Sequence, residues 1–161
     1  IGKVTALHLA RLGAHVIVHG RDAERVTRAA DELRKHAGPA AASELVADLA
    51  SLRTVRRAAA ELLDRFPAIH VLLHNAGVYM NERVLTEDGY ETTFAVNHLA
   101  PYLLTGLLLD RVKASGRARV VTVSSMVHVR AKLDFDNLQG KIGAASRSAI
   151  AAGPFPAPAS P

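Results

Sequence analysis

Small and polar residues follow directly after four segments of the sequence whose patterns are typical of strands. In chain order they are Gly20-Arg21, Asp48, Asn75-Ala76-Gly77 and Ser124-Ser125. An arginine can pair bidentately with a phosphate, a carboxylate can accept hydrogen bonds, and small residues let the backbone lie close to a ligand. These positions are therefore the first candidates for a binding site, although Arg21 could be merely solvated and Asp48 could only begin a helix.

Alternating helical and strand patterns from residue 1 to about 140 must position these groups. The apolar spacing predicts helices over 1–12, 22–36, 52–66 and 88–113, and strands over 15–20, 42–48, 69–74 and 119–125. Pro101 lies inside the last helical pattern and is expected to kink it. This alternation predicts an α/β fold with a doubly wound, Rossmann-type parallel sheet and a ligand at the carboxyl ends of the strands.

Composition excludes several classes of site. The 161 residues include no Cys and no Trp, and the eight histidines lack a metal-binding spacing such as HExxH, so we expect no disulfide and no metal site. The net charge of +5 comes from dispersed residues and indicates a solvated surface rather than a nucleic-acid interface. No apolar stretch reaches membrane-spanning length, and the first residues resemble no cleavable leader. We therefore expect a cytoplasmic protein with neither nucleic acid nor membrane as partner.

The composition changes near the carboxyl end. Sixteen of the 21 residues from Lys141 to Pro161 are Ala, Gly, Ser or Pro, and none is acidic. Such a segment has too few branched or aromatic side chains to offset its ordering entropy. We expect a Rossmann-type domain over residues 1–140 and a disordered tail over 141–161.

Several motifs in the right order resemble the short-chain dehydrogenase/reductase family. They are Asn75-Ala76-Gly77 after a buried strand, Asn97 within FAVNHLAPYLLT, and the strand VVTVSS that ends at Ser125. The longer segments DGYETTFAVNHLAPYLLTGLLLD and LDFDNLQG are similar to the retinol dehydrogenase branch of that family. The resemblance covers roughly residues 1–140.

The resemblance implies a dinucleotide cofactor. Gly2 would be the end of the glycine-rich turn that approaches the pyrophosphate, although it could simply begin a helix. Arg21 would pair with the extra phosphate of NADP, whereas NAD is the alternative and usually requires an acidic residue there. Asp48 and Leu49 would contact the adenine. The segment Asn75, Ala76 and Gly77 would lie against the cofactor, unless it is a turn without a ligand.

Two further residues are implied as parts of the catalytic site. Asn97 lies in a predicted helix, where asparagine competes for backbone groups, and in the family it helps to hold a water linked to the catalytic lysine. Ser125 matches the serine that hydrogen-bonds the substrate carbonyl. The family also uses a tyrosine with a lysine four residues later, and none of Tyr79, Tyr90 and Tyr102 has such a lysine.

The family pattern is therefore incomplete in this sequence. The family's central first strand precedes the motif that begins here, so we expect a gap in the sheet. The abrupt change of composition after Gly140 suggests a frameshifted or aberrantly terminated reading frame. We expect an NADP-dependent oxidoreductase for a small carbonyl or alcohol substrate, a homo-oligomer in a full-length form, and no activity of these residues alone. The alternative is a non-catalytic remnant that binds a nucleotide or a partner chain.

Overall fold

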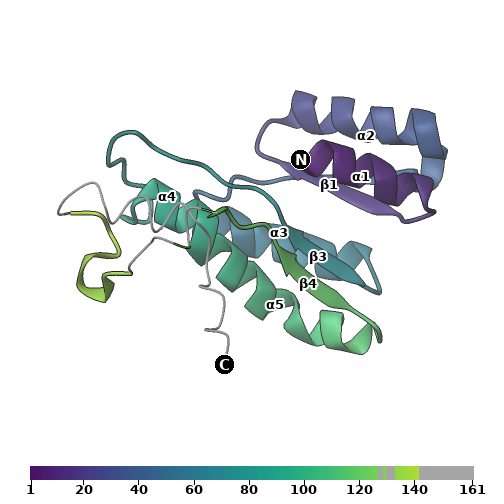
Figure 1. Ribbon diagram of the computed structural model, residues 1–161. Coiled ribbons are helices and arrows are strands. Elements are labelled where there is room, and N and C mark those ends of the chain that lie inside the picture. Colours follow the sequence, from purple (N-terminus) through teal and green to yellow (C-terminus); the bar gives the residue numbers. More distant parts are fainter. Residues whose placement is uncertain (127–128, 130–132, 142–161) are drawn as a thin grey trace. The chain divides into compact units, whose positions relative to one another are not determined.

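The chain folds as two compact units, Ile1–Leu49 and Ala50–Pro161, in a computed structural model (Figure 1). The structure describes residues 1–126, 129 and 133–141. Apart from Lys141, the predicted tail lies outside the described residues. None of the helices in this described part of the chain combines the length and apolar character that crossing a bilayer requires.

The first unit places two helices against one face of a two-stranded parallel sheet. Asp22 caps its second helix by accepting a hydrogen bond from the Arg25 N–H at 2.9 Å, as the sequence predicts. The core contains Ala30 and Leu33 of that helix together with Ala10 of the first. The elements are α1 (Gly2–Arg11), β1 (Val16–Gly20), α2 (Ala23–Ala37), the short helix η1 (Pro39–Ala41) and β2 (Ala42–Val46).

The strands β1 and β2 pair in register from Val16–Ala42 to Gly20–Val46. Val16 and Val18 pack against the helical core, so the alternating residues Ile17 and His19 face the other side of the sheet. Because the strands are parallel, Arg21 and the segment after β2 follow at the same edge. The strand predicted over 42–48 ends earlier, at Val46.

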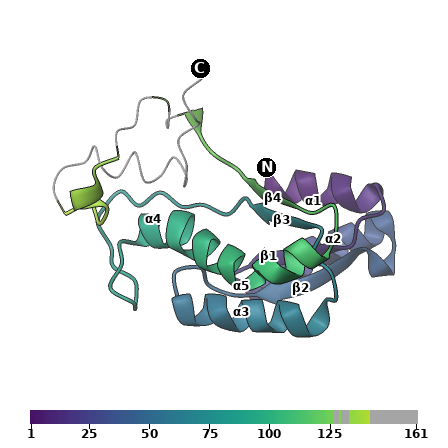
Figure 2. The same cartoon turned by 90° about the horizontal axis from the view of Figure 1, so that it is seen from below.

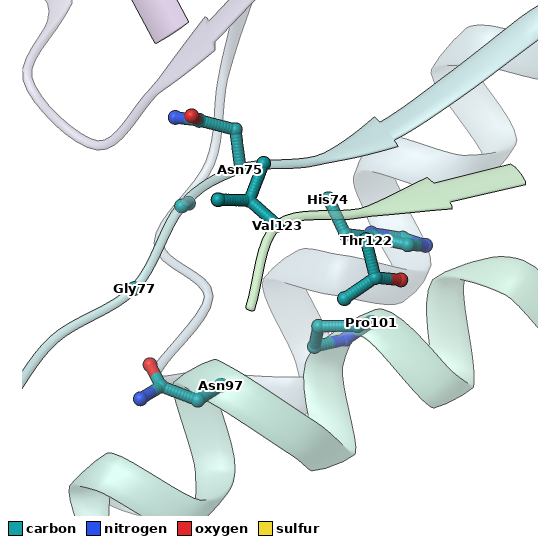
Figure 3. A pocket seen from close by; sticks show the side chains of 8 residues that line it. His74, Asn75, Gly77, Asn97, Pro101, Thr122 and Val123 are labelled. Atoms are coloured by element: carbon teal, nitrogen blue, oxygen red, sulfur yellow. The ribbon is translucent and has the colours of Figure 1, made fainter. Parts of the chain in front are cut away.

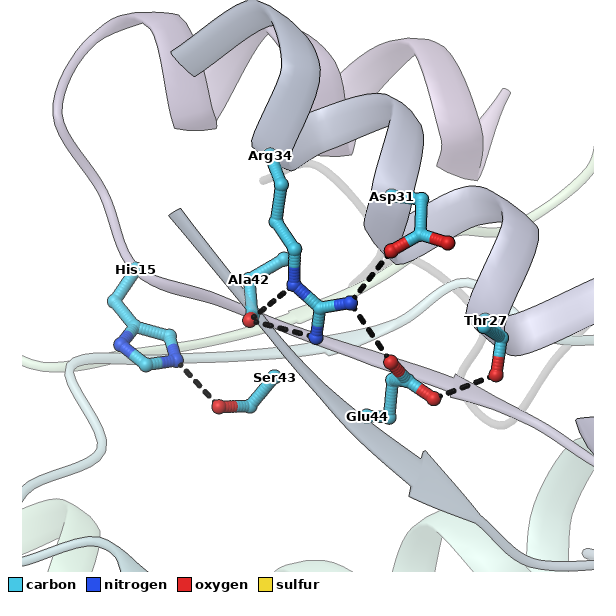
Figure 4. Close-up of polar contacts among 7 residues, drawn as sticks. All are labelled: His15, Thr27, Asp31, Arg34, Ala42, Ser43 and Glu44. Atoms are coloured by element: carbon cyan, nitrogen blue, oxygen red, sulfur yellow. Dashed lines mark hydrogen bonds and ion pairs between the residues drawn. The ribbon is translucent and has the colours of Figure 1, made fainter. Parts of the chain in front are cut away.

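A polar network centred on Arg34 fastens α2 to β2 (Figure 4). The Arg34 Nε and Nη2 groups donate to the Ala42 carbonyl at 3.3 and 3.2 Å, and Nη1 donates to the Asp31 and Glu44 carboxylates at 2.8 and 2.9 Å. The other Glu44 carboxylate oxygen accepts a hydrogen bond from the Thr27 hydroxyl at 2.7 Å. A planar guanidinium can satisfy three acceptors at once in this way, which lysine could not reproduce.

The hydrogen bonds from Thr27 and Arg34 lower the pKa of Glu44 below its ordinary value. A carboxylate with a lower pKa in the folded than in the unfolded state stabilises the fold above about pH 4.5, and this contribution is lost as the pH falls through the folded pKa. We therefore expect Glu44→Gln to lower the unfolding free energy at pH 7 and to make less difference at pH 3. Urea denaturation at both pH values measures this.

The exposed Glu82 provides the control for that measurement, because its side chain is far less involved in the fold. Glu82→Gln should leave the stability at pH 7 nearly unchanged. An equal loss of stability from Glu44→Gln at the two pH values would show that the charge of Glu44 is not what stabilises the unit.

The second unit packs a long helical segment and α3 together beside a second parallel strand pair. Ser51 caps α3 by accepting a hydrogen bond from the Thr54 N–H, as predicted. Buried Val55 and Leu62 on α3, and Leu108 and Val112 on α5, belong to its core, and the two helices run side by side (Figure 2). The elements are α3 (Leu52–Arg65), β3 (Val71–His74), α4 (Thr92–Phe94), η2 (Ala95–Leu99), α5 (Ala100–Ala114), β4 (Arg119–Thr122) and η4 (Phe135–Asn137).

Strand pairing joins β3 to β4 and β1 to β2, and no strand among the described residues links the two pairs. The strand predicted over 69–74 begins at Val71, and the one predicted over 119–125 ends at Thr122, so Ser124 and Ser125 follow the strand rather than belong to it.

The long helical segment begins at Thr92 rather than at residue 88. Residues 86–90 form a turn instead, in which Thr86 N–H donates to the Tyr90 carbonyl at 2.8 Å and Gly89 has a φ of 79°. That φ favours glycine. Glu91 then caps the helix by accepting a hydrogen bond from the Phe94 N–H.

A π-turn, not a simple kink, precedes Pro101 in this segment. Over Ala95–Leu99 the hydrogen bonds skip one additional residue, and the Ala100 N–H donates to the Ala95 carbonyl. Proline has no N–H to donate and its ring crowds the preceding turn, so the wider turn accommodates it without ending the helix. Asn97 lies at the centre of this π-turn.

Candidate functional site: the carboxyl ends of the second strand pair

A small hollow lies at the carboxyl ends of β3 and β4 in the second unit (Figure 3). Its volume is about 60 Å³, room for a few water molecules. Pairing continues past the end of β4, because the Val123 N–H donates to the His74 carbonyl at 2.9 Å. The hollow is lined by His74, Asn75, Ala76, Gly77, Asn97, Pro101, Thr122 and Val123.

The Asn97 side chain pins the loop that follows β3. Its Oδ1 accepts a hydrogen bond from the Val78 N–H, and its Nδ2 donates to the Val78 carbonyl, each at 2.8 Å. Asn97 is 8% exposed, so its side chain lies largely away from bulk water. Both of its polar groups are nevertheless hydrogen-bonded, and both bonds go to the backbone of Val78. The Thr93 hydroxyl accepts from the Met80 N–H at 3.3 Å and holds the same loop further along.

These contacts make Asn97 a positioning residue for the loop. The water-holding role implied for it stays a prediction. Its backbone carbonyl has Pro101 four residues later, which has no N–H to make the usual helical bond. The π-turn therefore directs the side chain to the loop while loosening the helical bonding around the carbonyl.

Gly77 lies beside the Asn97 amide. A Cβ added to Gly77 would meet the Asn97 Oδ1 at 3.4 Å, which is ordinary van der Waals contact, and Gly77 is not among the glycines with positive φ. Neither backbone conformation nor packing among the described residues therefore requires glycine here. Asn75 likewise uses only its backbone N–H, bonded to the Leu73 carbonyl at 3.2 Å, among the described contacts.

His74 is a lining residue that the sequence pattern did not single out, since a histidine in an apolar strand is usually a strand-face residue. Its Nε2 lies 2.8 Å from the Thr105 hydroxyl of α5. Burial lowers the pKa of His74, so the ring is neutral at pH 7 and acts as a hydrogen-bonding group rather than a cation. Its position immediately before Asn75 is the only sequence signal that could have pointed to it.

The structure brings together only part of the predicted catalytic set. Asn97 lies in the hollow with the segment 75–77, whereas Ser125 is exposed beyond the end of β4 and is not among the lining residues. Thr122, the last residue of β4, takes a place in the lining that the sequence did not predict. Ser125 as the substrate-binding serine therefore stays a prediction.

The predicted cofactor residues of the first unit lie on α1 or follow its two strands. Gly2 is the first residue of α1, whose first turn contains no acidic residue. Arg21 is exposed directly after β1, and Asp48 and Leu49 follow β2. Their roles stay predictions. No group of three or more potential metal-ligating side chains occurs among the residues that the structure describes.

Two acidic residues of the turn before the long helix meet the amino end of α3. The Asp88 carboxylate accepts from the Leu52 N–H at 2.8 Å, and Glu87 accepts a short hydrogen bond from the Ser51 hydroxyl. The bond from Ser51 lowers the pKa of Glu87. Negative charge at a helix amino end is stabilising, so this turn has a structural role.

The segment LDFDNLQG, residues 133–140, bonds residues on either side of the turn 86–90. The Gln139 side chain accepts from the Glu91 N–H at 2.8 Å, and its carbonyl accepts from the Arg83 Nε at 2.9 Å. Asn137 is buried within this segment and accepts from the Lys141 N–H at 2.8 Å. The segment is thus part of the folded second unit at least to residue 141.

A sequence model of the short chain dehydrogenase family matches residues 1–134. The chain therefore belongs to the short-chain dehydrogenase family, as the motifs predicted. It is similar to human retinol dehydrogenase 13, with 43% identity over 138 residues that cover 86% of this chain and 42% of that protein. The chain thus spans less than half the length of this relative.

Solved structures agree with the predicted α/β fold. A crystal structure of an uncharacterized protein from Mycobacterium paratuberculosis matches with a TM-score of 0.76 and 36% identity, covering 94% of this chain and 52% of that one. A short-chain dehydrogenase from Sphingobium yanoikuyae in complex with NADPH matches with a TM-score of 0.71 and 25% identity, covering 94% and 56%. The fold class and the family are confirmed.

Proposed function

We propose that this chain carries the NADP-binding part of an oxidoreductase that acts on a small carbonyl or alcohol substrate. The observation that carries the proposal is the loop 75–77. Among the described residues, neither packing nor backbone conformation requires glycine at position 77, and the Asn75 side chain makes no hydrogen bond. A site that keeps such residues at the ends of parallel strands is suited to a ligand lying against the backbone. The bound nicotinamide would supply or accept a hydride.

Several residues of the first unit, taken by itself, are suited to contacts with a dinucleotide. The amino end of α1 begins at Gly2 without an acidic residue to compete for its N–H groups, which suits a pyrophosphate. Arg21 is exposed and forms no ion pair among the described residues, so its guanidinium is available to a phosphate. Asp48 and Leu49 would face the adenine, and Arg21 favours NADP over NAD.

Two residues would have roles at the substrate and beside the reacting part of the cofactor. Ser125 would hydrogen-bond the substrate carbonyl, and Asn97 would keep the loop 75–80 in shape beside the cofactor. The sequence has no tyrosine followed four residues later by lysine, which is the pair that would transfer a proton to the substrate. We therefore propose that these 161 residues bind the cofactor without turning over a substrate, and that a full-length form is cytoplasmic and homo-oligomeric.

Calorimetric titration with NADPH and NADH tests the proposal. We expect the chain to bind NADPH more tightly, and Arg21→Ala to weaken NADPH binding by about 10- to 100-fold while changing NADH binding little, because an arginine–phosphate pair contributes about 1.5–3 kcal/mol. Arg28→Ala, on the exposed face of α2, is the matched control and should change neither affinity.

Two outcomes would contradict this assignment. Binding of neither cofactor would favour the alternative, a remnant that binds a partner chain. Oxidation of NADPH by the purified chain with any member of a panel of aldehydes and ketones would show that the proposed lack of turnover is wrong.

A further inference from the structure

His19, the residue before the last in β1, bonds the segment that follows β2. Its Nε2 lies 3.0 Å from the Ala47 carbonyl oxygen, and this contact is partly buried although the residue as a whole is exposed. A carbonyl oxygen can only accept a hydrogen bond, so Nε2 must carry the proton and donate it. The contact joins residues 28 positions apart.

Both backbone polar groups of Ala47 are hydrogen-bonded to residues of β1. Its N–H donates to the Gly20 carbonyl at 3.0 Å, and its carbonyl accepts from His19. The Ala47 carbonyl and the Asp48 N–H belong to one planar peptide group, so fixing the direction of the carbonyl also fixes the direction in which the chain enters Asp48. Ala47 is 3% exposed, and water has little access to replace the histidine bond.

The charge state of the ring suits this contact. Partial burial of the ring lowers the pKa of His19, while the bond to Ala47 and the nearby Asp48 carboxylate raise it by less. The ring is therefore neutral at pH 7 and donates through Nε2 without burying a cation. Glu44, the acidic residue of β2, is engaged on the helical face by Arg34 and Thr27 and does not compete.

We propose, resting on the proposed function, that His19 is a positioning residue that holds the peptide before Asp48 and so presents Asp48 and Leu49 to the adenosine part of the cofactor. Because adenosine is common to both cofactors, His19 affects NADPH and NADH alike. Arg21, two residues further on, acts on the additional phosphate alone. His19 would thus contribute to the affinity for both cofactors, whereas Arg21 would set the preference for NADPH.

Two substitutions at His19 test the hydrogen bond apart from the bulk of the ring. His19→Leu keeps an apolar side chain of moderate size but cannot donate, whereas the Gln Nε2 in His19→Gln stands as many bonds from the backbone as the histidine Nε2 and can donate to Ala47. Titration calorimetry should show His19→Leu binding NADPH and NADH about fivefold more weakly, and His19→Gln binding close to the parent chain. Circular dichroism checks that each variant is folded.

The outcomes separate this inference from the proposed function. If the parent chain binds and His19→Leu binds equally well, or if His19→Gln is as weak as His19→Leu, the positioning role is overturned. A loss confined to NADPH would also overturn it, since that result belongs to a phosphate contact. If the parent chain binds neither cofactor, the proposed function fails and the inference fails with it.

Discussion

Replacement of Asn97 by leucine is expected to destabilise the second unit by about 2–3 kcal/mol, the cost of leaving a backbone donor and acceptor without partners. The Asn97 side-chain amide bonds both the N–H and the carbonyl of Val78, each at 2.8 Å. Leucine branches at the same atom and is not smaller than asparagine, so the substitution leaves no cavity and removes the hydrogen bonds. Urea denaturation followed by circular dichroism measures it.

Asn75→Ala provides the control, because the Asn75 side chain makes no hydrogen bond among the described residues. It should change the unfolding free energy by less than about 0.5 kcal/mol. In a folded Asn97→Leu variant, the Val78 amide should also exchange its hydrogen faster. Equal stability of Asn97→Leu and the parent chain would show that the loop does not depend on the two hydrogen bonds from Asn97 to Val78.

Replacement of Gly20 by alanine is expected to destabilise the first unit by about 1–3 kcal/mol through overpacking. A Cβ at Gly20 would lie 2.8 Å from the Val26 Cγ2 of α2, closer than carbon atoms approach in normal contact. Val26 is 3% exposed and β-branched, so it has little freedom to turn away. The φ of Gly20 is not positive, so the cost is steric.

Gly106→Ala in α5 is the matched control. A methyl group there meets no described atom within 4 Å beyond its chain neighbours and the adjoining backbone of its own helix, and alanine is the better helix former by about 1 kcal/mol, so the substitution should be neutral or stabilising. Combining Gly20→Ala with Val26→Ala should recover part of the loss in a double-mutant cycle. Additive effects of the two substitutions would show that the contact is not responsible.

The sequence predicted the elements whose signals are local. Both helix caps, Asp22 and Ser51, lie where a polar residue precedes an apolar helical pattern, and β1 and β4 coincide with β-branched runs. The family followed from motifs at strand ends. The start of the long helix was predicted too early because the pattern continued through the Asp88-Gly89 turn, which only a positive φ at glycine reveals.

The parts of the site that the sequence did not predict depend on contacts between distant residues. Asn97 was singled out as an unusual helical residue, but its partner Val78 lies 19 positions away, so its side chain's direction could not be deduced. His74 lies in an apolar strand, and the pattern of that strand does not show which of its side chains face the hollow. The π-turn was also missed, since a proline in a helix predicts a disturbance without specifying its hydrogen bonding.

The π-turn gives the segment between Glu91 and Pro101 a fixed length. A π-turn holds one residue more than the α-helix of the same extent, so deleting a single residue between Glu91 and Asn97 would restore regular helical winding. Because the wider turn sets the direction of the Asn97 side chain, closing it would turn that side chain away from Val78. Insertions and deletions in this stretch should therefore be selected against, even where individual side chains can be exchanged.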